Sequence, residues 1–150
     1  MNNSNRLLML ASIICFILSI FQIAIGFSPS LSLYFGAPES LVKSPNALII
    51  TSIIIGSILA LFGLYAFSGA GKFVKLPWLK QILLGIGVIF LLRGLLLLPE
   101  LLVIFDIIES SIPVEQRFIY FSIGALIIGF IFIKGTMGAS FRSKQNKLTT

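Results

Sequence analysis

Residues 82–98 read ILLGIGVIFLLRGLLLL, a continuous apolar run that contains one charge, Arg93. Pro99-Glu100 and a second apolar stretch, which reaches Phe105, follow this run. About 20 apolar residues are enough to cross the hydrocarbon core of a bilayer as an α-helix. Because an arginine at the bilayer centre costs about 3 kcal/mol on insertion scales, Arg93 is also the first candidate for a functional residue.

The composition of the whole chain is that of a membrane protein. Of its 150 residues, 57% are hydrophobic and 11% are charged, and the mean hydropathy is +1.08. Apolar runs predict four spans in a single domain, at about 7–27, 47–67, 79–105 and 118–133. Each span is expected to be an α-helix, because backbone groups in lipid must be satisfied within their own segment. The continuous runs lack the alternation typical of a β-barrel.

The basic residues predict the orientation of the spans. One side of a four-span arrangement holds Arg6, Lys72, Lys75, Lys80, Lys134, Arg142, Lys144 and Lys147. The other side holds Lys43 and Arg117. Since Lys and Arg are retained on the cytoplasmic side of short loops, both termini are expected to be cytoplasmic. The net charge of +6 then indicates contact with anionic lipid headgroups rather than with nucleic acid.

The connections between spans contain recognisable helix signals. Ser44-Pro45 predicts the start of the second span, and the glycines of residues 68–71 predict its end. Residues 28–43 are too apolar for an aqueous loop and predict one or two short helices at the outer interface. The polar residues 143–150 predict a disordered tail.

Each predicted span also carries a row of small or polar residues at helical spacing. The rows are Ser12, Cys15, Ser19, Gln22 and Gly26; Ser52, Gly56, Ala60 and Gly63; Gly87 and Gly94; and Ser122, Ala125 and Gly129. Lipid provides no hydrophobic drive for helix association, so helices associate where small residues allow close backbone approach. The rows therefore predict an antiparallel bundle of four transmembrane helices with the small residues inside.

Arg93 and Glu100 are seven residues apart, which places them on one helix face about 10 Å apart along the axis. Pro99 removes the hydrogen bond to the carbonyl of Leu95 and predicts a kink. Arg93 lies in the outer half of the membrane if the span ends at residue 98. It lies near the midplane if the span reaches residue 105.

In an antiparallel bundle, Gln22, Tyr120 and Ser122 lie at a depth similar to that of Arg93 and Glu100. These five residues form the candidate ligand-binding site, which would hold an anionic group such as a lipid headgroup or a small carboxylate. The alternative is an internal ion pair and hydrogen-bond network that fixes the register of the helices.

The sequence predicts no catalytic residue, no cofactor and no metal. Histidine is absent and Cys15 is the single cysteine, so a Cys/His nucleophile pair and a multi-cysteine metal site are excluded. Asp106, Glu109 and Glu115 supply fewer oxygens than a hard cation requires and are expected to form a solvated acidic loop.

Three stretches, residues 63–71 (GLYAFSGAG), Leu76-Pro77 and Leu92-Arg93-Gly94, resemble small uncharacterised bacterial four-span membrane proteins. The resemblance implies a multi-pass protein of the bacterial inner membrane and no known activity. The sequence then favours a non-enzymatic accessory, assembly or lipid-interacting component. The alternative is a small carrier or binder of an anionic solute or lipid at Arg93. The expected partners are membrane lipids, with a protein partner or a second copy left open.

The predicted orientation is testable by cysteine labelling in intact cells. Cysteines that replace Ser30 or Ser40 should react with a membrane-impermeant maleimide added outside. Cysteines that replace Lys72 or Gln145 should react only after permeabilisation, because the positive-inside bias keeps them cytoplasmic. Labelling at position 145 from outside would contradict the orientation.

Overall fold

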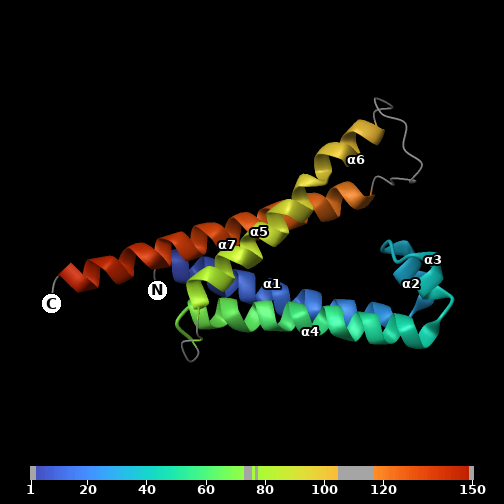
Figure 1. Ribbon diagram of the computed structural model, residues 1–150, viewed down its shortest axis with the longest axis horizontal. Helices are drawn as coiled ribbons and strands as arrows, with labels where there is room; N and C mark the ends of the chain where they lie inside the picture. The colour runs from blue at the N-terminus through green and yellow to red at the C-terminus, as the bar shows by residue number, and fades with distance from the viewer. Residues whose placement is uncertain (1–2, 73–75, 77, 105–116, 149–150) are drawn as a thin grey trace.

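The computed structural model describes residues 3–72, 76, 78–104 and 117–148. In this part of the chain the regular elements are all helices, and they are drawn in chain order in Figure 1. They are α1 (Asn3–Gly26), α2 (Pro29–Tyr34), α3 (Glu39–Val42), α4 (Pro45–Gly69), α5 (Leu79–Leu95), α6 (Leu97–Ile104) and α7 (Arg117–Leu148).

Four helical segments are long and apolar enough to cross a membrane. They are Asn3–Gly26, Pro45–Gly69, Leu79–Pro99 and Ile119–Ala139. The predicted all-helical, multi-pass organisation is therefore confirmed. The predicted outer end of the third span, Phe105, lies outside the described residues.

Both ends of α4 have the local chemistry that the sequence predicts. Ser44 is the N-cap residue, and Pro45 follows at the start of the helix, where its missing N–H leaves no hydrogen bond unmade. At the other end Gly71 has a φ of +76°, a backbone conformation that glycine adopts without steric cost. The N–H of Gly71 donates to Ser68 O (2.9 Å) and that of Lys72 to Phe67 O (3.3 Å), which together form a Schellman cap.

The connection between α1 and α4 contains the two short helices α2 and α3, as predicted. Gly36 has a φ of +90° and ends α2 with the same type of cap. The Ser32 hydroxyl donates to Ile25 O (2.9 Å), which ties α2 to the end of α1. Phe35, just after α2, lies 5.1 Å from the ring of Phe21 and 5.5 Å from that of Phe121 in α7.

Helices α1 and α4 pack closely through their small residues. Ser12 Oγ donates to Gly63 O (2.9 Å), and Ser19 Oγ donates to Gly56 O (2.7 Å). Gly26 lies directly against the side chain of Ser52, where a Cβ on the glycine would clash. The predicted small-residue faces of these two helices are confirmed as packing faces.

Helices α5 and α7 form a second close pair. A Cβ on Gly129 would lie 2.8 Å from Leu91 N and 2.9 Å from Gly87 O, so the two backbones are nearly in contact. One helix turn along, Gly94 packs against Leu126. The predicted faces at Gly87, Gly94 and Gly129 are confirmed in the same way.

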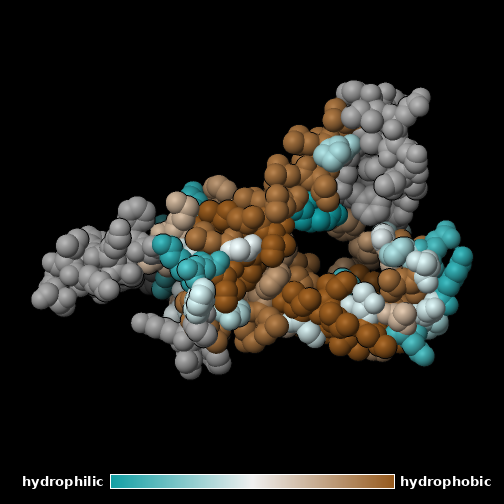
Figure 2. Space-filling model, in the orientation of Figure 1, coloured by the Kyte–Doolittle hydropathy of each residue, from teal (hydrophilic) through white to brown (hydrophobic). Residues whose placement is uncertain are grey.

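The two pairs meet at one end of the molecule and diverge toward the other (Figure 1). Figure 2 shows the resulting hollow between them, with apolar surface along its lower and left edges. The core lies at the closed end and consists of Leu8, Ala11, Cys15, Ala66, Ala70, Leu83, Ile86, Ile128 and Phe132. At the open end, the contact between Phe35 and Phe121 bridges the pairs.

Two further predictions concern helix continuity. The expected break near Pro99 is confirmed, since α5 ends at Leu95 and α6 begins at Leu97. The predicted disorder of residues 143–150 is wrong for 143–148, because α7 continues to Leu148, and 149–150 lie outside the described residues. After Gly138 the sequence has neither glycine nor proline and is rich in Lys, Arg and Gln, so an established helix propagates at little cost.

The contact between α5 and α7 predicts a large difference between two alanine substitutions on α7. Gly129→Ala places a methyl group against backbone atoms of α5 and should lower the free energy of unfolding by about 1–3 kcal/mol. Gly124→Ala meets open space and should be neutral, or stabilising by up to about 1 kcal/mol from helix propensity. Thermal or denaturant unfolding in detergent checks both. Equal behaviour of the two variants would contradict the packing.

Candidate functional site

Arg93 lies in the last turn of α5. Its Nη1 donates to the hydroxyl of Ser122 on α7 at 3.1 Å. Ser122 is completely buried, whereas Arg93 remains exposed. The arginine thus contacts α7 while its side chain remains exposed.

Local packing explains how the arginine reaches Ser122. The neighbouring Gly94 has no side chain, so α5 approaches α7 until Gly94 meets Leu126. Leu126 lies one turn beyond Ser122 on the same face of α7. Because Gly94 contacts Leu126, the adjacent Arg93 comes within reach of Ser122. The small residue that packs the pair also positions the charge.

The end of α5 favours a cation at this place. The carbonyl groups in the last turn of a helix lack intrahelical partners and carry the negative end of the helix dipole. Helix α5 ends at Leu95, and Pro99 has no N–H to donate to the carbonyl of Leu95, so the negative end of the helix dipole falls in the turn that holds Arg93. The helix break therefore lowers the electrostatic cost of placing an arginine in an apolar span.

The other candidate residues lie in different surroundings. Gln22 lines a separate cavity to which Arg93 does not contribute. Tyr120 is 74% exposed. Glu100 belongs to α6, but its side chain lies outside the described part of the structure, so its pairing with Arg93 stays a prediction. Of the five candidates, the structure brings together Arg93 and Ser122.

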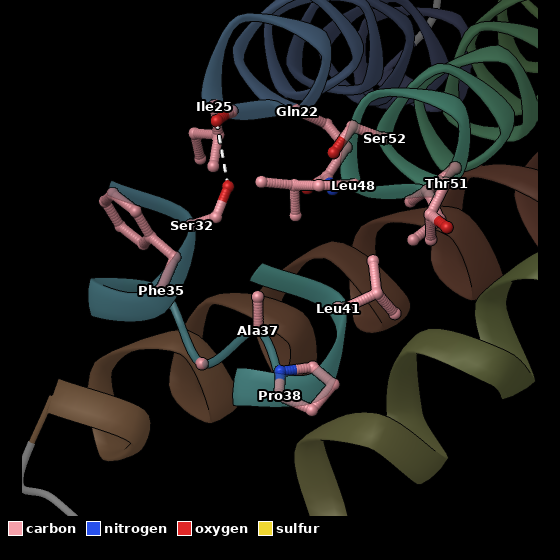
Figure 3. Close-up of a pocket in the computed structure, with 12 residues that line it drawn as sticks. Gln22, Ile25, Ser32, Phe35, Ala37, Pro38, Leu41, Leu48, Thr51 and Ser52 are labelled. Carbon is pink, nitrogen blue, oxygen red and sulfur yellow. Dashed lines mark hydrogen bonds between the residues drawn. The ribbon is translucent and has the colours of Figure 1, made fainter. Parts of the chain in front are cut away.

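The cavity that contains Gln22 was not predicted from the sequence. It has a volume of about 260 Å³ and lies between the α1–α4 pair and the short helices α2 and α3 (Figure 3). Hydroxyl groups of Ser32, Thr51 and Ser52 contribute to its lining, and none of its lining residues is charged. Its chemistry suits water or a neutral polar group. The apolar character of residues 28–43 predicted short helices at the outer interface, but not the cavity that these helices enclose.

The side chain of Arg93 is suited to recognise an anionic group. A guanidinium offers five N–H donors in a plane, which match a carboxylate or a phosphate, and such bonds strengthen where water is scarce. Exposed Leu92, Leu95 and Leu96 surround Arg93 along the chain and suit an apolar tail. Among the described residues no group of three or more His, Cys, Asp and Glu lies close enough together to hold a metal ion. The acidic residues 106, 109 and 115 lie outside that part.

The fold and this site define a class, a multi-pass helical membrane protein with a polar contact between two of its spans. Comparison of the chain with protein-family models, curated proteins and solved structures finds no significant match. The functional argument therefore rests on the geometry.

The hydrogen bond between Arg93 and Ser122 predicts that their substitutions are not additive. Arg93→Leu, Ser122→Ala and the double variant should show a coupling of about 1 kcal/mol in unfolding free energy. The reason is that a hydrogen bond to a charged group contributes more to stability than a bond between two neutral groups. Thermal unfolding in detergent measures this coupling.

Ser57→Ala is the matched control, because Ser57 Oγ donates to Ile53 O within α4. Its effect should add to that of Arg93→Leu. Additivity for Ser122→Ala as well would mean that the contact does not contribute to stability. The same cycle with Glu100→Leu tests the predicted ion pair.

Proposed function

We propose that the chain is a non-enzymatic component of the bacterial inner membrane that acts in accessory or assembly roles, through contacts with lipids and with helices of other proteins. In this proposal its spans run antiparallel and both termini are cytoplasmic. The contacts between α1 and α4 support the antiparallel arrangement, because Ser12 meets Gly63 whereas the later Ser19 meets the earlier Gly56. The distribution of Lys and Arg along the chain supports the orientation.

The open end of the bundle is the observation that carries this proposal. A self-sufficient bundle closes around one core along its whole length, whereas this core occupies one end. Toward the other end, α4 exposes a stripe of large apolar residues at helical spacing: Ile50 (58% exposed), Ile54 (55%), Ile58 (44%) and Leu61 (53%). Within a membrane, such a face is covered by lipid or by another helix. Three of these four side chains are β-branched isoleucines, whose restricted rotamers lose little entropy when a helix packs on them.

A second candidate function is supported by the Arg93 contact. An exposed guanidinium that donates to a buried serine suits the anionic group of a solute or lipid. In this alternative, the protein is a small carrier or binder. The space between the helix pairs would then serve as the route by which the ligand enters, rather than as a surface for another protein.

Photo-cross-linking in native membranes separates the two candidates. A photoreactive amino acid in place of Ile54 should give a discrete adduct with a second protein, because that side chain faces outward. The control is the same amino acid in place of Ala66 on the same helix, which is fully buried and should give adducts within the chain only.

Lipid adducts alone at position 54 would reject the accessory role. The binder role would then be favoured if an anionic amphiphile raised the melting temperature of the wild type and Arg93→Gln abolished that effect. If neither protein adducts nor Arg93-dependent stabilisation were found, both candidates would fail.

A further inference from the structure

A groove of about 470 Å³ lies between the first turns of α1 and the middle of α7, at the closed end of the bundle. Arg6, Leu7 and Leu10 line it from α1. Phe130, Ile131 and Lys134 line it from α7. It is the largest of the cavities described for this structure and lies within the 300–1,000 Å³ typical of ligand pockets.

Small residues of α7 build this groove. A Cβ on Gly135 would lie 2.9 Å from Leu8 Cγ, and Gly138 lies directly against Ser4, so α1 and α7 are in close contact here. Residues 6, 7 and 10 of α1 share one helix face, as do residues 130, 131 and 134 of α7. The two faces stand on either side of the contact and form the walls of the groove.

The charge in the groove has one sign. Arg6 and Lys134 are its charged lining residues, both are exposed, and no lining residue is acidic. Lys134 Nζ lies 5.2 Å from the centre of the Phe130 ring, which holds the ammonium group above an apolar surface. The walls thus combine two cations with aromatic and aliphatic side chains.

The two cations both lie near an end of a candidate span. Arg6 is near the beginning of the candidate span Asn3–Gly26, and Lys134 is near the end of the candidate span Ile119–Ala139. Long basic side chains at such positions extend toward the headgroup layer while their stems cover apolar surface. The polar end of the groove therefore lies at the level of lipid phosphates, with Leu10 and Phe130 deeper in the apolar zone.

We propose that this groove is a binding site for an anionic phospholipid of the surrounding bilayer. The phosphate would sit between Arg6 and Lys134, and an acyl chain would lie along Leu7, Leu10 and Phe130. An anionic headgroup complements the two cations, whereas the apolar walls would give no binding energy to inorganic phosphate. Basic pockets between membrane helices are known to hold such headgroups. The proposal depends on the helices spanning a bilayer but not on Arg93.

The test measures binding of a defined lipid to the purified full chain in a neutral detergent. Dioleoylphosphatidylglycerol, dioleoylphosphatidylcholine and inorganic phosphate are titrated separately, with melting temperature and native mass spectrometry as readouts. Phosphatidylglycerol should stabilise the wild type and appear as a bound adduct. The double variant Arg6→Gln/Lys134→Gln should bind it roughly 30-fold more weakly, since each basic residue contributes about 1 kcal/mol at an anionic surface.

The matched control is Lys43→Gln/Lys72→Gln, which removes the same charge from exposed positions outside the groove. It should bind phosphatidylglycerol as the wild type does. If both double variants bound phosphatidylglycerol equally weakly, the loss of affinity would be an effect of net charge, and the proposed site would be wrong. Equal stabilisation by phosphatidylcholine or by phosphate would also overturn it. A dimer that only the groove variant loses would assign the groove to a second copy of the chain instead.

The result is separable from the role of Arg93. If the groove variant keeps full lipid binding while Arg93→Gln loses it, the proposed lipid site is wrong and the anion binder is favoured. If only the groove variant loses binding, the site holds whatever the outcome of the cross-linking at position 54.

Discussion

Close approach between helix backbones is the constraint on which the rest of this structure depends. Lipid tails are as apolar as the side chains, so moving an apolar side chain from lipid into a helix contact gives no hydrophobic free energy. Helices therefore associate through close packing and hydrogen bonds that lipid cannot provide. Two serine hydroxyls of α1 donate to carbonyl groups of glycines in α4, and a glycine of α7 lies against the backbone of α5. A serine reaches the carbonyl of a neighbouring helix most easily where the facing residue is small, and here both acceptors are glycines. Small residues thus set both the distance and the hydrogen bonds.

The same constraint explains where the polar groups lie. Ser12 and Ser19 are buried because they are part of a helix contact, and Ser122 is buried under Arg93 for the same reason. The arginine itself is positioned by Gly94, which brings the helices together one turn away. At the other end of α7, Gly135 and Gly138 admit α1 and thereby create the groove beside them. The Arg93–Ser122 contact and the groove therefore both result from the way the helices pack.

Much of the fold follows from the sequence because its causes are local. The length of the apolar runs determines the four spans, Ser44-Pro45 and Gly71 determine the ends of α4, and Pro99 determines the break after α5. The site was predictable only in part. Arg93 stands out in the sequence as a charge within a long apolar run. Its partner, however, depends on how α5 is rotated against α7, and the contact between Gly94 and Leu126 determines that rotation. Gln22 has the right depth and faces another cavity, since depth does not determine direction.

The unbroken length of α7 has a mechanical consequence. Its 32 residues extend about 48 Å, slightly more than the full thickness of a bilayer with its headgroups. Ser122 and Lys134 lie on this one rod, about 18 Å apart along its axis. A stiff rod cannot tilt at one end alone, so a displacement of α7 that shifts Lys134 in its groove also shifts Ser122 beneath Arg93. The helix thus couples the contact between Ser122 and Arg93 to the groove that Lys134 lines.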